Sequence, residues 1–269
     1  LINFAKKKDI DWIILDHYDI TSDYIKELKT NGFKILSIDD NAQIYYHSDI
    51  VVNQNIGSEE LDFKGSKNTK FLIGTQYVML RDELLKKQKK KIKENVENIL
   101  VTLGGIGFYD LNLKIIKKLK KYLDENLKVT IVLGGLNKSK FDMKSKIIKE
   151  KNSNFDFIFS PEDMSELYLE SDIAISSGGS SCYELAYFGI PNLIISLAKN
   201  QLNVVKELDK RNISIYLGGK EEIDSDEFIE NILKMIKNKK LREKMIKNGT
   251  NLIDGKGKKR IVDAMNSYK

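Results

Sequence analysis

The sequence is poor in cysteine and histidine, and each shortage excludes a class of protein. Cys182 is the only cysteine among 269 residues. The chain therefore cannot form an internal disulfide, which fits the reducing cytoplasm. His17 and His47 are the only histidines, and the spacing of the His, Cys and carboxylate residues shows no set of metal ligands. We expect a cytoplasmic protein without a bound metal or other cofactor.

Long hydrophobic runs are also absent. No window approaches the ~18 uninterrupted apolar residues of a membrane-spanning helix. In the first residues, Leu1 to Lys8, the lysines follow a very short apolar stretch, which is the reverse of a secretory signal. The chain begins with Leu1 rather than methionine and is already in an apolar run at Trp12–Leu15. We therefore expect a further N-terminal segment before Leu1.

Arginine is scarce, although the chain is basic. The net charge of +6 and the pI of about 9.0 are compatible with nucleic-acid binding through phosphate contacts. However, only Arg81, Arg211, Arg242 and Arg260 are arginines, and the lysines are dispersed along amphipathic stretches such as Lys114–Lys121. Dispersed charge is typical of solvated helix faces, so we favour a protein that does not bind nucleic acid.

Short apolar runs alternate with amphipathic stretches along the whole chain, a pattern typical of βαβ units and parallel sheets. We predict strands at Trp12–Leu15, Lys34–Ile38, Ile50–Val52, Phe71–Ile73, Ile99–Leu103, Val129–Leu133, Phe157–Phe159, Ile173–Ser176, Leu193–Ser196 and Ile213–Tyr216. Helices are predicted at Asp23–Thr30, Leu111–Leu123, Met143–Lys149, Met164–Glu170, Ser181–Phe188 and Leu202–Lys210, and from Asp226 onward. The predicted fold class is α/β.

The length favours two domains, because single cores stop growing near this size. The lysine-rich stretch Leu84–Lys93 has the weakest apolar signal of the first half, which indicates a linker or an exposed helix. We predict a partial N-terminal domain over residues 1–93 and a C-terminal domain over residues 94–255. A C-terminal helix over residues 256–269 could return to the N-terminal domain.

The most informative run extends from Ile173 to Pro191, where an apolar strand leads through two glycines and two serines into a helix. Glycines let the backbone approach a ligand closely, and a helix N-terminus favours an anion. Glu184, about one helical turn further on, could accept hydrogen bonds from both hydroxyls of a ribose. The alternative is a tight turn that binds nothing, with Glu184 on the helix surface.

Two further glycine pairs, Gly104-Gly105 and Gly134-Gly135, each follow a predicted strand. In a parallel sheet the three pairs would emerge at the same carboxyl edge, where ligands of open α/β sheets bind. Their convergence favours a binding role. None of them fits the G-x-G-x-x-G or P-loop pattern, which argues against a dinucleotide or ATP-hydrolysis site.

The run of strand, Gly-Gly-Ser, Glu184 and Gly189-Ile190-Pro191 resembles the C-terminal nucleotide-sugar domain of the GT-B glycosyltransferase fold. More narrowly, the chain resembles the UDP-sugar hydrolases of pseudaminic acid biosynthesis and the related spore-coat polysaccharide biosynthesis proteins. The motifs that carry the narrower resemblance are Asp16-His17-Tyr18, Ile38-Asp39-Asp40, Asp49 with Asn53-Gln54-Asn55, Gly74 through Tyr77 to Leu80-Arg81, Gly104-Gly105, Lys199-Asn200-Gln201, and Asp254-Gly255-x-Gly257 with Arg260.

The resemblance implies a GT-B-like fold of two Rossmann-like domains, the N-terminal one incomplete, with a cleft between them and the nucleotide held mainly by the second. It implies that Glu184 binds the ribose and that the glycine–serine loop holds the diphosphate. The nucleotide-binding candidates are Gly104, Gly105, Gly178, Gly179, Ser180, Ser181 and Glu184. Asn200 and Gln201 are the candidates for contacts to the sugar.

The catalytic candidates are Tyr18 and His17, at the end of the first predicted strand. The resemblance places Tyr18 beside the sugar. The family's proposed general base is a histidine in a segment that would precede Leu1, and His17 occupies a different motif. The chain also departs from the family after Gly105, where Ile106 to Asp110 stand in place of Thr-Asp or Ser-Asp.

The function implied by the resemblance is hydrolysis of a UDP-linked amino-deoxy sugar, of the UDP-2,4-diacetamido-2,4,6-trideoxy-hexose type. The reaction releases UDP and free sugar for nonulosonic acid or surface polysaccharide biosynthesis, and it needs a base for water and a clamp for the leaving diphosphate. The alternatives are a sugar transferase or epimerase on a UDP-sugar, and a non-catalytic nucleotide-sugar-binding protein. The sequence does not determine the oligomeric state.

Three remaining candidates have simpler interpretations. Asp39 and Asp40 are adjacent after a strand, where a cap or turn role is favoured over a carboxylate pair. Cys182 lies at a helix start that would stabilise a thiolate, but without a placed base we favour a packing role. His47, beside Tyr45-Tyr46, is interpreted as structural.

Overall fold

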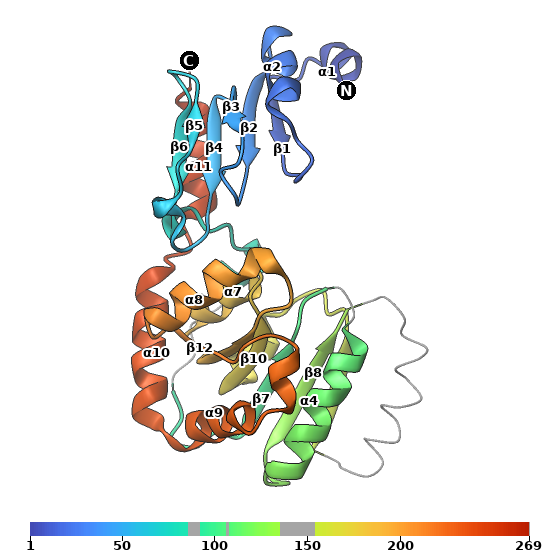
Figure 1. The fold of residues 1–269 in the computed structure, drawn as a ribbon, viewed down its shortest axis with the longest axis vertical. Helices are drawn as coiled ribbons and strands as arrows, with labels where there is room; N and C mark the ends of the chain where they lie inside the picture. Colours follow the sequence, from blue (N-terminus) through green and yellow to red (C-terminus); the bar gives the residue numbers. More distant parts are fainter. Residues whose placement is uncertain (86–91, 106–107, 135–153, 269) are drawn as a thin grey trace. The chain divides into compact units, whose positions relative to one another are not determined.

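The computed structural model describes residues 1–85, 92–105, 108–134 and 154–268. The chain divides into two compact units, one formed by Leu1–Met79 with Gly255–Lys269 and the other by Leu80–Asp254. Each unit contains an open parallel sheet flanked by helices (Figure 1). The α/β class predicted from the alternating pattern is therefore confirmed.

The first unit contains a four-stranded parallel sheet in the order β1-β2-β4-β6. Its strands are β1 (Trp12–Leu15), β2 (Lys34–Ile38), β4 (Ile50–Asn53) and β6 (Lys70–Ile73), and a separate parallel pair joins β3 (Tyr45–Tyr46) to β5 (Lys64–Gly65). The helices are α1 (Ile2–Lys7), α2 (Ser22–Thr30), α11 (Gly257–Asn266) and the 3-10 turns η1 (Ser58–Glu60) and η2 (Thr75–Tyr77).

Apolar side chains on alternate positions of these strands cover both faces of the first sheet. Ile13 and Ile35 pack with Leu28 of α2 in one cluster. Leu36, the next residue of β2, packs with Ile261 of α11 in the other. Because successive side chains of a strand point to opposite faces, one apolar run supplies two cores, and α11 closes the second of them.

The second unit contains a six-stranded parallel sheet in the order β12-β11-β10-β7-β8-β9. Its strands are β7 (Asn98–Thr102), β8 (Lys128–Leu133), β9 (Phe155–Phe159), β10 (Ile173–Ser177), β11 (Asn192–Ile195) and β12 (Ser214–Tyr216). Its helices are α3 (Asp82–Leu85), α4 (Tyr109–Tyr122), α6 (Ser165–Glu170), α7 (Ser181–Phe188), α8 (Leu202–Lys210), α9 (Asp226–Lys237), α10 (Lys239–Leu252), η3 (Lys199–Gln201) and η4 (Glu221–Asp224).

The order of these strands shows that the chain builds the second sheet in two directions. From β7 it adds β8 and β9 on one side, and it then returns to add β10, β11 and β12 on the other. Strand β10 pairs directly with β7, with Ser176 opposite Thr102. The switch point of the sheet therefore lies between β7 and β10, which is where open α/β sheets bind their ligands.

Helices cover both faces of the second sheet. Val101 and Ile175 pack with Ile115 of α4 on one face, whereas Leu100 packs with Leu185 of α7 on the other. Strands buried on both faces consist of nearly continuous apolar residues. For this reason the apolar runs located every strand of the two main sheets to within two residues at each end.

Some short elements were not predicted, and some predicted segments lie partly or wholly outside the described residues. The two-residue strands β3 and β5 and the helix α1 were not predicted, because such short elements carry no readable periodicity. Within the stretch Leu84–Lys93, Leu84 is fully buried in a cluster of the second unit, and residues 86–91 lie outside the described residues. The helix predicted at Met143–Lys149 lies outside them too. Among the described helices, none combines the length and the apolar character that crossing a bilayer requires.

The buried side chain of Arg242 connects three segments of the second unit. Its side chain is only 2% exposed. Nη1 donates to the carbonyl oxygens of Met235 and Ile236, at 2.9 and 2.6 Å, and Nη2 donates to that of Glu94 at 2.6 Å. The guanidinium thus ties α10 to the end of α9 and to the segment that leads into β7.

We predict that Arg242→Ala lowers the free energy of unfolding by about 2–4 kcal/mol, because charge-assisted hydrogen bonds are lost and carbonyl groups lose their partner. The control is Arg211→Ala, which removes an exposed arginine at the C-terminal end of α8 that pairs with Glu207 of that helix. This change should cost under about 1 kcal/mol. Urea unfolding of the two variants measures the difference. Equal losses would contradict the role of Arg242.

Candidate functional site

The loop between β10 and α7 lies at the carboxyl edge of the second sheet, beside the switch point. Strand β10 ends at Ser177, and helix α7 begins at Ser181. The N–H of Cys182 donates to the carbonyl oxygen of Gly179 at 3.1 Å. Within the described part of the chain, no backbone acceptor engages the N–H groups of Gly179, Ser180 and Ser181. Open N–H groups at the positive end of a helix dipole form a site for an anion.

The two glycines of this loop have different surroundings. A Cβ on Gly178 would lie 2.5 Å from Val205 Cγ1 and 3.0 Å from Gln201 Cβ. A Cβ on Gly179 would meet no atom nearer than Ser177 Oγ, at 3.9 Å. Gly178 is therefore required for the packing of α8 and η3 against the loop, whereas Gly179 leaves the backbone open to a ligand.

The glycines after β7 and β8 lie next to this loop. Gly104 has a φ of +95°, which side chains of L-residues rarely adopt, and a Cβ there would lie 3.8 Å from Ser177 Oγ. A Cβ on Gly134 would overlap the carbonyl oxygen of Gly105. The structure thus brings these three loops together at one edge, while the remaining glycine of the third pair, Gly135, lies outside the described residues.

Glu184 lies one turn into α7, and it is buried rather than displayed on the helix surface, with 7% exposed. Its Oε2 accepts a hydrogen bond from Tyr168 Oη at 2.6 Å, and its Oε1 lies 3.4 Å from Arg81 Nε. Burial, and next the charge of Glu184, raise the pKa of Tyr168 well above its usual value. A carboxylate offers about four lone-pair sites, so these two partners fix Glu184 and leave it capacity for ligand hydroxyls.

Tyr168 and Arg81 were not among the predicted site residues. Arg81 stood in one of the family motifs, whereas nothing in the sequence near Tyr168 marked it, because it looks like one more apolar position of α6. Only the packing of α6 against α7 brings the phenol to the carboxylate. The two residues position Glu184 from opposite oxygens.

The residues after β11 lie next to the loop between β10 and α7. Gln201 Oε1 accepts a hydrogen bond from the Leu197 N–H at 2.8 Å, so this side chain braces its own loop. Asn200, on the same 3-10 turn, is exposed. Of the two predicted sugar-binding residues, Asn200 is therefore the more exposed to solvent.

Cys182 is buried below the loop. Its Sγ donates to the carbonyl oxygen of Gly179 at 2.8 Å, and burial raises the pKa of the thiol to about 12. The thiol therefore stays protonated at neutral pH, which fits the packing role and excludes a ready nucleophile.

A second polar group lies at the carboxyl edge of the first sheet. Tyr18 follows β1, Asp40 follows β2 and Asn55 follows β4, and these strands are neighbours in the sheet. Tyr18 Oη donates to Asp40 Oδ2 at 2.9 Å, and Asn55 Nδ2 donates to Asp40 Oδ1 at 2.7 Å. The Tyr18 residue is 65% exposed. The exposed phenol of Tyr18 therefore directs its proton to the carboxylate of Asp40.

The turn interpretation is right for Asp39 and wrong for Asp40. Asp39 Oδ1 accepts hydrogen bonds from the N–H groups of Asn41 and Ala42, at 2.8 and 2.7 Å, which makes the turn. Adjacent side chains point differently, and Asp40 turns to Tyr18 instead. His17 accepts a hydrogen bond from the Asp19 N–H at 3.2 Å, so its imidazole engages its own loop.

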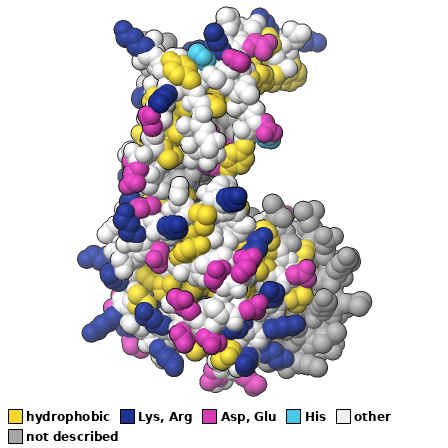
Figure 2. All heavy atoms as spheres, in the orientation of Figure 1, with side chains coloured by type: hydrophobic (Ala, Val, Ile, Leu, Met, Phe, Trp, Pro, Cys, Tyr) yellow, Lys and Arg dark blue, Asp and Glu magenta, His cyan; other side chains and the backbone are white. Residues whose placement is uncertain are grey.

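Charges of both signs are intermingled over the face of the molecule shown in Figure 2. Lysine and glutamate or aspartate pairs recur on exposed segments, as between Lys114 and Asp224 and between Lys259 and Asp263. Such pairs on both units are typical of solvated surfaces rather than of a single-sign nucleic-acid face.

Comparison with known protein families finds one that matches more than half of the chain. Residues 98–265 match the glycosyltransferase family 28 C-terminal domain. The chain belongs to this family. The family 28 match begins at β7 and contains all six strands of the second sheet, together with the glycine loops after β7, β8 and β10.

Two relatives align with most of the chain. The chain is 26% identical over 261 residues to the spore coat polysaccharide biosynthesis protein SpsG of Bacillus subtilis, an alignment that covers 96% of this chain and 76% of that protein. It is 27% identical over 218 residues to the UDP-2,4-diacetamido-2,4,6-trideoxy-beta-L-altropyranose hydrolase of Campylobacter jejuni, with 80% of this chain and 77% of that protein covered.

Among solved structures, the fold is similar to that of the UDP-GlcNAc 2-epimerase from Neisseria meningitidis bound to UDP-GlcNAc. The TM-score is 0.63 at 17% identity, with 98% of this chain and 78% of that chain covered. With the family 28 match, the two parallel-sheet units identify the fold as GT-B-like, as predicted.

The two glycines of the β10–α7 loop give a matched pair of substitutions. We predict that Gly178→Ala lowers the free energy of unfolding by about 1–3 kcal/mol, because the new methyl group overlaps Val205. Gly179→Ala should change it by less than about 1 kcal/mol, since its Cβ meets open space. Chemical unfolding tests both, and equal costs would show that the loop packs differently.

Proposed function

We propose that the protein is an enzyme that acts on a UDP-linked sugar and holds the nucleotide at the loop between β10 and α7. The observation that carries this proposal is the pairing of open N–H groups at Gly179 to Ser181 with the buried carboxylate of Glu184. The N–H groups suit the diphosphate, since a helix N-terminus attracts anions. The carboxylate suits the ribose, since it accepts hydrogen bonds from two hydroxyls. Ser181 and Glu184 are three residues apart on α7, a rise of ~4.5 Å along the helix axis.

The comparisons support a UDP-sugar as the substrate class. The C. jejuni relative is named as a hydrolase of a UDP-linked diacetamido-trideoxy sugar. The N. meningitidis structure, which has a similar fold, holds UDP-GlcNAc. The position of the proposed nucleotide loop at the switch point of the sheet agrees with how α/β proteins of this kind bind ligands.

The finer proposal is hydrolysis of a UDP-2,4-diacetamido-2,4,6-trideoxy-hexose. Water attacks the anomeric carbon, the bond from that carbon to the UDP oxygen breaks, and UDP and free sugar leave. The charge that develops on the leaving diphosphate would be stabilised by the N–H groups of the α7 terminus. The proton lost by water needs an acceptor.

From the resemblance of its motif, we propose that Tyr18 takes part in this proton transfer. Tyr18 Oη donates to Asp40, so the phenol can take the proton of the attacking water while it passes its own proton to the Asp40 carboxylate. Asp40 is held by Asn55 on its other oxygen and keeps the phenol oriented. Tyr18 is thus the proposed catalytic residue, and Asp40 is the final proton acceptor, which acts through it.

Sugar transfer is the second candidate, because family 28 is itself a glycosyltransferase family. An acceptor hydroxyl would then replace water at the same anomeric carbon. Incubating the protein with the UDP-sugar alone separates the two reactions. Release of UDP and free sugar in water supports the hydrolase. A bound UDP-sugar that stays intact until an acceptor alcohol is added identifies a transferase.

For the nucleotide site, we predict that Glu184→Gln weakens UDP binding by roughly 1–3 kcal/mol, because charge-assisted hydrogen bonds to the ribose are lost. Glu83→Gln is the matched control, since Glu83 also lies near Arg81, at 3.3 Å, but outside the loop. Calorimetric titration with UDP measures both. If the affinity of Glu184→Gln equals that of the unchanged protein, the ribose assignment is wrong.

For the chemical step, we predict that Tyr18→Phe and Asp40→Asn each lower kcat at least tenfold while UDP affinity stays unchanged. General acid–base catalysis by one side chain typically contributes about 10²–10⁴-fold, so a tenfold loss is a lower bound. Asp39→Asn, a change at the neighbouring turn, should leave kcat within about twofold. Steady-state UDP release from the UDP-sugar is the measurement, and an unchanged kcat for Tyr18→Phe removes Tyr18 from the mechanism.

A further inference from the structure

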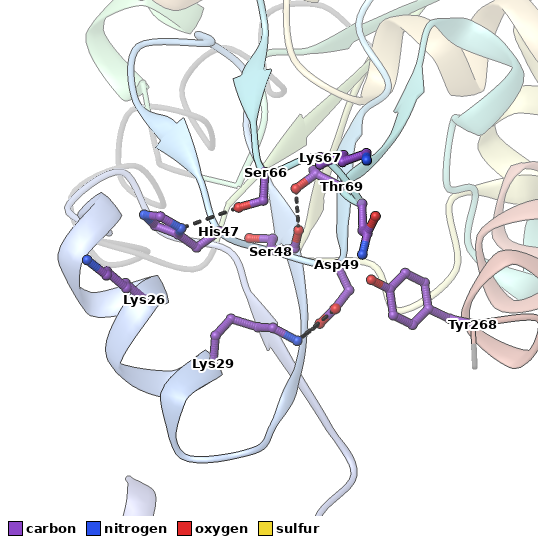
Figure 3. A pocket seen from close by; sticks show the side chains of 10 residues that line it. Lys26, Lys29, His47, Ser48, Asp49, Ser66, Lys67, Thr69 and Tyr268 are labelled. Carbon is purple, nitrogen blue, oxygen red and sulfur yellow. Dashed lines mark hydrogen bonds and ion pairs between the residues drawn. The ribbon is translucent and has the colours of Figure 1, made fainter.

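A separate cavity of about 450 Å³ lies within the first unit (Figure 3). Asp49 comes directly before β4 and Thr69 directly before β6, so the cavity lies at the amino edge of this sheet. The group of Tyr18 and Asp40 lies at the opposite, carboxyl edge. The lining residues are Lys26 and Lys29 of α2, His47, Ser48, Asp49, Ser66, Lys67, Asn68, Thr69 and Tyr268.

The one carboxylate among the lining residues is already neutralised. Asp49 is buried, and both of its oxygens lie 2.7 Å from Lys29 Nζ. Its Oδ2 also accepts a hydrogen bond from the Ile35 N–H at 2.7 Å. Burial, together with a hydrogen bond to Asp49, raises the pKa of Tyr268 to about 12. Asp49 therefore holds the wall together and does not offer a site for a cation.

The remaining charge of the wall is positive. Three lysines and one aspartate line the cavity, a net charge of +2. After Lys29 pairs with Asp49, Lys26 and Lys67 account for this excess. Both are exposed, and no hydrogen bond or ion pair with another described residue engages either of them. In Figure 3 they stand on different walls, Lys26 on α2 and Lys67 on the loop before β6.

Polar groups between the lysines are held in fixed positions. Ser66 Oγ lies 3.4 Å from His47 Nδ1, and Thr69 Oγ1 donates to the Ser48 carbonyl oxygen at 2.8 Å. The His47 ring also packs at 5.1 Å from that of Tyr45. The wall thus combines the ammonium groups of Lys26 and Lys67 with the side-chain amide of Asn68, and such N–H donors bind phosphate oxygens.

We propose that this cavity binds a small phosphate monoester of about the size of a sugar phosphate. The positive excess of Lys26 and Lys67 attracts the phosphate, and the polar wall receives the rest of the molecule. The volume lies in the range of ligand cavities, about 300–1,000 Å³, and exceeds what inorganic phosphate alone fills. The site is separate from the nucleotide loop, which belongs to the second unit.

The test is calorimetric titration of the full chain at low ionic strength with glucose 6-phosphate, inorganic phosphate and glucose. The double variant Lys26→Ala/Lys67→Ala should weaken glucose 6-phosphate binding at least tenfold. The matched control Lys7→Ala/Lys8→Ala removes the same charge from exposed positions of the first unit outside the cavity, and its affinity should stay within twofold. Inorganic phosphate should bind more weakly, and glucose should not bind.

Three outcomes would overturn the proposal. They are no binding of glucose 6-phosphate to the unchanged protein, an equal loss in both double variants, and an equal affinity for inorganic phosphate and glucose 6-phosphate. The second would mean diffuse charge attraction, and the third a site for free phosphate alone. UDP titration of the same variants should be unchanged, so failure here is distinguishable from failure of the nucleotide site.

Discussion

The direct parallel pairing of β7 with β10 is the constraint on which the candidate site depends. Parallel strands end at one edge, so the loops after β7 and β10 must emerge side by side, although more than seventy residues separate Thr102 from Ser176 in the chain. The same pairing fixes the register that places Ser177 between Gly104 and Gly179. The open N–H groups of the α7 terminus and the third glycine loop then follow from the sheet rather than from any local preference.

A second feature of the molecule is that its important carboxylates are positioned by protein donors before any ligand arrives. Glu184 is held by Tyr168 and Arg81, and Asp40 is held by Tyr18 and Asn55. Asp49 is held by Lys29, by the Ile35 N–H and by Tyr268. Burying Glu184 and Asp49 without partners would be costly, and their partners offset that cost. The number of donors distinguishes the roles: Asp49 is saturated and structural, whereas Glu184 and Asp40 retain acceptor capacity.

The apolar runs of Ile99–Leu103 and Ile173–Ser176 predicted strands well, because a parallel strand buried on both faces must be apolar along its length. Helix α7 was predicted from Ser181 to Phe188, and Gly189 at a φ of +73° ends it. The convergence of the glycine loops also followed from the parallel class. The pair of strands β3 and β5 did not, since two-residue strands depend on pairing and carry no pattern. The turn role predicted for Asp40 was wrong, because its partners Tyr18 and Asn55 come from other loops.

The sequence by itself determined the α/β class, the positions of the strands and the glycine–serine loop, because these depend on periodicity and on local backbone chemistry. Only the tertiary structure decided which side chains meet. The partners of Glu184 come from α6 and from the segment before α3, those of Asp40 from the loops after β1 and β4, and those of Asp49 from α2 and the C-terminal end of the chain. Contacts between distant segments are set by packing and strand order, which no local pattern encodes.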